Sequence, residues 1–100
     1  MAEIVHKPVL VNEVMDLLGV KPGGTYVDAT VGSGGHAGAI LKIAGGAGRL
    51  VAIDRDEEAI RRAGRRLLGF GENVVFVRGN FSEVKRLAGE AGVEKADGVL

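Results

Sequence analysis

The sequence has no cysteine among its 100 residues. A disulfide framework and a thiolate metal site are therefore excluded, and no metal site is expected. No stretch approaches the roughly 20 apolar residues of a membrane-spanning helix. The N-terminus also lacks the long apolar run after a basic region that marks a signal peptide. These absences suit a protein of the reducing cytoplasm.

The sequence also lacks net charge, because 13 basic residues balance 13 acidic ones. A neutral chain has no overall attraction for nucleic acid, so any RNA-binding surface must be local or lie outside this segment. One predicted helix carries a basic cluster, but glutamates precede two of its arginines by one helical turn. This pattern favours a solvated, ion-paired helix face over a phosphate site. The cluster consists of Arg61, Arg62, Arg65 and Arg66.

Glycine, in contrast, is abundant, and most of the 17 glycines cluster at predicted turns. Between the turns, apolar residues alternate between helical spacing and short continuous runs typical of buried strands. Strands are predicted at 25–28, 49–53, 74–77 and 96–100, and helices at about 10–18, 36–44, 57–68 and 82–91. Asp56 and Ser82 are the expected N-caps of the last two helices.

This alternation predicts one α/β domain over residues 1–100, with a parallel sheet of about four strands flanked by helices. Continuous apolar strands are expected where helices cover both faces of a sheet. Because the fourth strand coincides with the end of the sequence, we expect the first half of a doubly wound fold. Its open edge would favour pairing with a second copy.

A glycine loop between the first strand and the next helix is the strongest candidate binding feature. Gly32, Gly34 and Gly35 allow positive φ and close approach of backbone to a ligand. The spacing Gly32-x-Gly34-x-x-Ala37 fits the loose fingerprint of dinucleotide-binding loops. A glycine-rich turn without a ligand is the plain alternative.

Two further candidates follow the second and third strands. Asp54 could accept hydrogen bonds from both ribose hydroxyls of a nucleoside. Asp56 is better placed to cap the following helix, which would leave Asp54 free. Phe81, after Gly79 and Asn80, could pack on an adenine ring or belong to the core.

Asp28, at the end of the first strand, separates two possible ligands. NAD would bring a pyrophosphate to the start of the following helix, where a nearby carboxylate repels it. S-adenosylmethionine has no phosphate but carries a sulfonium and an ammonium, which a carboxylate attracts. Asp28 therefore favours the methyl donor, although a small NAD-binding domain remains an alternative.

Five segments, in order along the chain, carry a family resemblance: His6-x-Pro8-Val9-Leu10, Tyr26-x-Asp28-x-Thr30-x-Gly32-x-Gly34-Gly35-His36, Ile53-Asp54-Arg55-Asp56, Gly79-Asn80-Phe81-Ser82 and Asp97-Gly98. Together they resemble the bacterial 16S rRNA cytosine-N4 methyltransferases, the MraW family. The resemblance implies a Rossmann-like class I fold that uses S-adenosylmethionine to methylate a cytidine of the small ribosomal subunit. It also implies that Gly34, Gly35, His36, Asp54 and Phe81 bind this cofactor.

The resemblance also indicates what is missing. The family continues past Asp97-Gly98 into a segment that borders the target base, and it holds an inserted helical domain; the sequence contains neither. No residue stands out as a general base: His36 is expected to contact the cofactor or brace the loop, and His6 to be structural. We expect a cofactor-binding half without catalysis of its own. A self-associating folding module without activity is the alternative.

Overall fold

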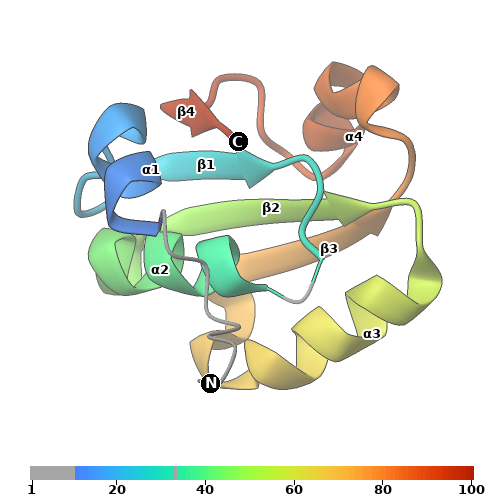
Figure 1. Ribbon diagram of the computed structural model, residues 1–100. Helices are drawn as coiled ribbons and strands as arrows, with labels where there is room; N and C mark the ends of the chain where they lie inside the picture. Colours follow the sequence, from blue (N-terminus) through green and yellow to red (C-terminus); the bar gives the residue numbers. More distant parts are fainter. Residues whose placement is uncertain (1–10, 33) are drawn as a thin grey trace.

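The structure is a computed structural model, and it describes residues 11–32 and 34–100. Strands and helices alternate along these residues, as Figure 1 shows. The strands are β1 (Thr25–Asp28), β2 (Arg49–Asp54), β3 (Val74–Arg78) and β4 (Gly98–Val99). The α-helices are α1 (Val11–Leu18), α2 (Gly35–Ala44), α3 (Glu57–Arg66) and α4 (Val84–Glu90). The short 3-10 helices are η1 (Gly45–Ala47), η2 (Leu68–Asn73) and η3 (Phe81–Glu83).

The strands form one parallel sheet in the order β3-β2-β1-β4. The predicted α/β fold, a parallel sheet of about four strands flanked by helices, is confirmed. Strand order reverses direction between β1 and β4, because the chain moves from β1 outward to β3 and then returns to the other side of β1. Ligands of such sheets bind beside this reversal, at the carboxyl ends of the strands.

Helices cover the two faces of the sheet unequally. One face packs against α1, α2 and α3, and its core includes Met15, Tyr26, Ile40, Leu41, Leu50, Ala63 and Leu67. The other face packs against α4, and its smaller core includes Val27, Val51, Ile53, Leu87 and Ala88. The central residues of the strands therefore carry apolar side chains on both faces of the sheet, because each face packs against at least one helix.

Several predicted boundaries are wrong. The third helix ends at Arg66 rather than Leu68, and the chain continues into η2, where Gly71 has a φ of 58° that only glycine adopts readily. The helix predicted from about residue 10 is described over Val11–Leu18, and Leu10 lies outside the described residues.

The fourth helix and the fourth strand are both shorter than predicted. Ser82 is not the cap: it lies in η3, and the side chain of Asn80 accepts a 3.1 Å hydrogen bond from its backbone N–H. The strand predicted over 96–100 is reduced to Gly98–Val99. Flanking hydrogen bonds from Asp97 N–H to Thr25 and from Leu100 N–H to Val27 continue its contact with β1. Because β4 pairs with a strand on one side only, fewer backbone hydrogen bonds determine where it begins and ends.

Candidate functional site

The carboxyl ends of three neighbouring strands open onto one cavity. Its volume is about 370 Å³, and its walls come from the residues that follow β1, end β2 and follow β3. The lining residues are Ala29, Thr30, Asp54, Arg55, Gly79, Asn80 and Phe81. Asp54 and Phe81, far apart in sequence, are thus brought to a single site. Thr30, Arg55 and Asn80 were not predicted, although each is within two residues of a predicted one.

Asp54 fixes the geometry of this cavity. One carboxylate oxygen accepts a 3.1 Å hydrogen bond from the backbone N–H of Gly32, and the other accepts a 2.9 Å bond from Asp56 N–H. As expected, Asp56 and not Asp54 caps α3, but Asp54 makes these two structural contacts of its own. Each carboxylate oxygen can accept more than one hydrogen bond. Acceptor capacity for two ribose hydroxyls remains while the backbone bonds hold the carboxylate in place.

The glycine loop needs glycine for its backbone shape. Gly34, the N-cap of α2, has φ 91° and ψ 13°, and Gly32 has φ 55°. Both lie in the left-handed region that other residues adopt at a cost of about 1–2 kcal/mol. The N–H of Val31 donates a 2.8 Å bond to the carbonyl of Ile53, so the loop is also tied to β2 through the backbone.

Asp28 is a buried carboxyl group, with 2% of its surface exposed. Burial raises the pKa of Asp28 above its ordinary value, while a 3.2 Å hydrogen bond from the N–H of Thr30 and the nearby His36 act in the opposite direction. A buried carboxyl group that is costly to ionise alone suits a cationic ligand group, which would stabilise its charged form.

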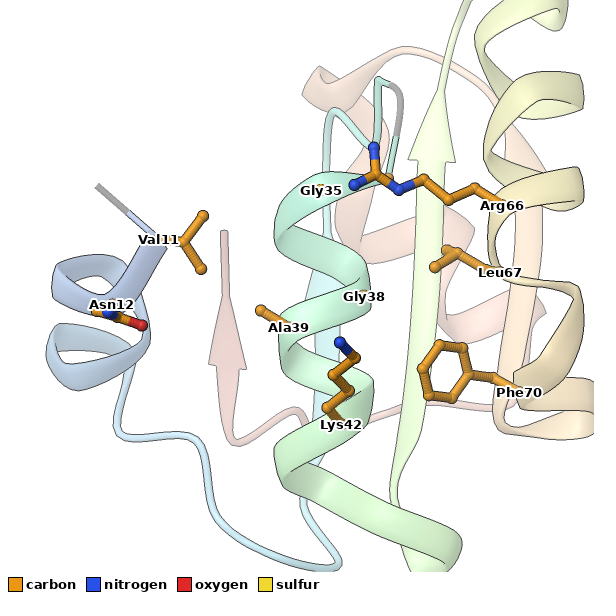
Figure 2. Close-up of a pocket in the computed structure, with 10 residues that line it drawn as sticks. Val11, Asn12, Gly35, Gly38, Ala39, Lys42, Arg66, Leu67 and Phe70 are labelled. Atoms are coloured by element: carbon orange, nitrogen blue, oxygen red, sulfur yellow. The ribbon is translucent and has the colours of Figure 1, made fainter. Parts of the chain in front are cut away.

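The remaining predicted residues do not all line this cavity. Phe81 is 64% exposed at the rim of the cavity, so the alternative that places it in the core is wrong. Gly34 and Gly35 line a second hollow along α2 (Figure 2). His36, half-buried in the first turn of α2, lines neither hollow, but it lies close enough for a positive charge on its ring to lower the pKa of Asp28.

Within 11–32 and 34–100, no cluster of three or more His, Asp or Glu side chains is arranged to hold a metal ion. Over the same ranges, no helix has the length and apolar character needed to cross a membrane.

A parallel sheet with a glycine loop after β1 and a carboxylate at the end of β2 defines a Rossmann-like fold. Similarity to solved structures shows which group of Rossmann-like proteins has this fold. A SAM-dependent O-methyltransferase from Thermotoga maritima superposes with a TM-score of 0.70 at 28% identity, over 83% of this chain and 32% of that one. The fold is that of the S-adenosylmethionine-dependent methyltransferases.

Residues 3–100 match the MraW methylase family, and the chain belongs to this family. A ribosomal RNA small subunit methyltransferase H from Symbiobacterium thermophilum is 53% identical over 95 residues, which are 95% of this chain and 30% of that protein. The enzyme of the same name from Solidesulfovibrio magneticus is 48% identical over 96% of this chain and 30% of its own length. The chain thus spans about 30% of the length of these curated relatives.

An RNA methyltransferase from Salinibacter ruber, solved in complex with S-adenosyl-L-homocysteine, shares the fold. Its TM-score is 0.67 at 24% identity, over 79% of this chain and 52% of that one. At this identity the likeness concerns the fold alone.

Proposed function

We propose that this chain binds S-adenosylmethionine at the carboxyl ends of β1, β2 and β3, as the cofactor-binding part of a methyltransferase that modifies a cytidine N4 in 16S ribosomal RNA. The observation that carries the proposal is the Asp54 carboxylate, held by two backbone N–H groups beside a cavity that Phe81 borders. Family membership and the names of the relatives support the ribosomal RNA substrate.

Each predicted residue has a distinct part in this proposal. Asp54 accepts hydrogen bonds from the ribose hydroxyls, and Phe81 packs on the adenine ring. Asp28 attracts the cationic methionine end, and Gly32, Gly34 and Gly35 let the loop backbone approach it. His36 lies close enough for a positive charge on its ring to favour the ionised form of Asp28 at the same end of the site.

The bound cofactor supplies an electrophilic methyl group. Cytosine N4 is a poor nucleophile, because its lone pair is delocalised into the ring, so catalysis requires an extruded base and removal of a proton. Positioning accounts for much of the rate of such a displacement. The described residues position the donor, and we assign none of them as the general base. We expect methylation to require further protein segments, and we expect the enzyme to act in the cytoplasm on its ribosomal substrate.

Calorimetry with S-adenosylhomocysteine tests the cofactor proposal. We expect saturable one-to-one binding by the folded chain, and much weaker binding of NAD. A folded chain that gives no heat with S-adenosylhomocysteine contradicts the proposal, and tighter binding of NAD would support the dinucleotide alternative. Incubation of the same chain with small ribosomal subunits and labelled donor should give no methyl transfer.

The exposed edge of β4 supports a second, separate proposal, which is self-association. β4 pairs with β1 on one side, lies at the end of the described sheet, and leaves Val99 55% exposed. Unpaired strand edges attract other strands. We propose that two copies of this chain pair through β4. Sedimentation over a range of concentrations should show a dimer, and a lysine at position 99 (Val99→Lys) should weaken it, whereas a strictly monomeric chain contradicts the proposal.

A further inference from the structure

A groove runs along the face of α2 that points away from the sheet (Figure 2). It has a volume of about 730 Å³, and it lies between Val11 of α1 and the segment from the end of α3 into η2. Its walls include Gly38 and Lys42 from α2, and Leu67 and Phe70 from the opposite side. Leu67 belongs to the core, and Val11, Ala39 and Phe70 are partly buried and pack against it, so the groove is an outer surface of that core.

The groove is elongated. An adjoining hollow of about 290 Å³ shares Lys42 and Phe70 with this groove. It extends to Gly45 and Gly46 at the far end of α2. The near end is formed by Gly35, in the loop that we assign to the cofactor. A groove with these two ends suits an extended chain better than a compact small molecule.

Among the residues that the structure describes, the charged side chains in the walls of the groove and of the adjoining hollow are those of Lys42 and Arg66. Among the described residues, neither hollow has an aspartate or glutamate in its wall. Lys42 and Arg66 are exposed, and neither forms an ion pair within the described part of the chain. In Figure 2 the guanidinium group of Arg66 extends across the groove toward Gly35, and the ammonium group of Lys42 points into the space beside Phe70.

The other arginines of α3 differ in this respect. Arg61 lies 3.8 Å from Glu57 and Arg62 lies 4.0 Å from Glu58, as expected for a solvated face. The basic cluster predicted from sequence is therefore divided. Its first half is paired with glutamates, whereas Arg66 faces a cavity.

We propose that this groove binds an unpaired segment of the RNA substrate, with phosphates at Lys42 and Arg66 and a base against Phe70. The proposal rests on the proposed function, because it takes the substrate to be RNA. Cations that track a backbone and an aromatic ring that accepts a base are the two elements of single-strand recognition. A strand in the groove would pass Gly35 and so lead toward the methyl-donor site.

The test compares two double variants of the complete chain that lose the same charge. Lys42→Gln/Arg66→Gln removes both groove cations, and Arg61→Gln/Arg62→Gln removes two paired cations from the same helix region. Fluorescence anisotropy measures binding of a labelled single-stranded RNA and of a matched RNA duplex at several salt concentrations. Calorimetry with S-adenosylhomocysteine and thermal melts accompany every variant, so loss of RNA binding is separated from loss of the cofactor site or of the fold.

We expect the groove double variant to weaken single-strand binding about tenfold or more and to reduce the salt slope by about 1.4, which corresponds to two lost phosphate contacts. The control double variant should change both much less. Phe70→Leu, which keeps an apolar side chain, should weaken binding at least fivefold, because it removes only the stacking ring. The duplex should bind less tightly than the single strand.

Several results would overturn the groove proposal. One is equal loss in the two double variants, which indicates diffuse electrostatics. Another is binding of the duplex as tightly as the single strand. A third is a groove variant with changed melting or sedimentation but unchanged RNA affinity, which assigns the groove to a protein segment or a second copy. Absence of RNA binding in a chain that binds S-adenosylhomocysteine overturns this proposal and leaves the cofactor proposal standing.

Discussion

The carboxylate of Asp54 accepts a 3.1 Å hydrogen bond from the backbone N–H of Gly32, and so joins the end of β2 to the loop after β1. The same side chain closes the turn into α3 through Asp56. Asp54 therefore stabilises the backbone around the site in which we propose that it also binds ribose. Its removal should affect both stability and binding, and these two effects can be separated.

Asp54→Ala should lower the affinity for S-adenosylhomocysteine about tenfold or more, because each hydrogen bond to a charged group contributes about 1.5–3 kcal/mol. It should also cost about 1–3 kcal/mol of folding free energy, since two backbone N–H groups lose their acceptor. Calorimetry and urea unfolding measure the two effects.

Asp56→Ala is the matched control for this change. Asp56 caps α3 by accepting a 2.9 Å bond from Glu58 N–H and does not line the cavity. Loss of the cap should cost about 1 kcal/mol of stability and leave cofactor affinity unchanged. Equal loss of affinity in the two variants would mean that Asp54 acts only through the fold.

Asp28→Asn should stabilise the chain in a pH-dependent way. Burial raises the pKa of Asp28 in the folded state above its ordinary value of 3.8. Its contribution to stability is complete below that ordinary value and is lost as the pH rises through the folded pKa. The asparagine variant avoids this loss, so its advantage in melting temperature should be absent at low pH and present at neutral pH.

The same substitution should weaken cofactor binding, because the amide offers no charge to the cationic end of the ligand. Binding to the unaltered chain should tighten as the pH rises through the pKa of Asp28, since only the ionised carboxylate attracts an ammonium group. Asp16→Asn, at an exposed position of α1, is the control and should change neither property. An asparagine variant with unchanged affinity would remove Asp28 from the site.

Phe81→Ala should change binding without changing stability. The ring is 64% exposed, so its loss should alter the folding free energy by no more than about 0.5 kcal/mol. Loss of a stacking partner should weaken S-adenosylhomocysteine binding by roughly fivefold or more. Leu68→Ala removes an apolar side chain that is 79% exposed and outside the cavity, and its affinity should match that of the unaltered chain.

Gly34→Ala should destabilise the chain by about 1–2 kcal/mol, because φ is 91° at this position and a side chain there is strained. A Cβ atom would also lie 3.5 Å from Leu67, which is ordinary contact, so strain and not collision is the cause. Gly64→Ala, inside α3 with nothing within 4 Å of the added atom, should instead stabilise by up to about 1 kcal/mol. Thermal unfolding of both variants measures the contrast; a neutral Gly34→Ala would contradict it.

The sequence by itself determined the class of fold, because apolar periodicity and glycine punctuation depend on residues close together in the chain. β1 and β2 begin where predicted, and Asp56 caps α3 as expected. The order of these elements was enough to predict a parallel sheet, since the crossover rules leave few alternatives. The residues Asp28, Asp54 and Phe81 were found in the same way, from their places at strand ends.

Only the tertiary structure decided what these residues contact. That Asp54 is bonded to Gly32 depends on β1 and β2 lying side by side, which no local pattern specifies. Tertiary packing also separates the arginines of α3: Arg61 and Arg62 lie beside glutamates, whereas Arg66 lines the groove. The groove itself joins Val11 to Phe70, because α1 and η2 flank the same helix. Contacts between distant segments follow from packing, and packing depends on the whole chain at once.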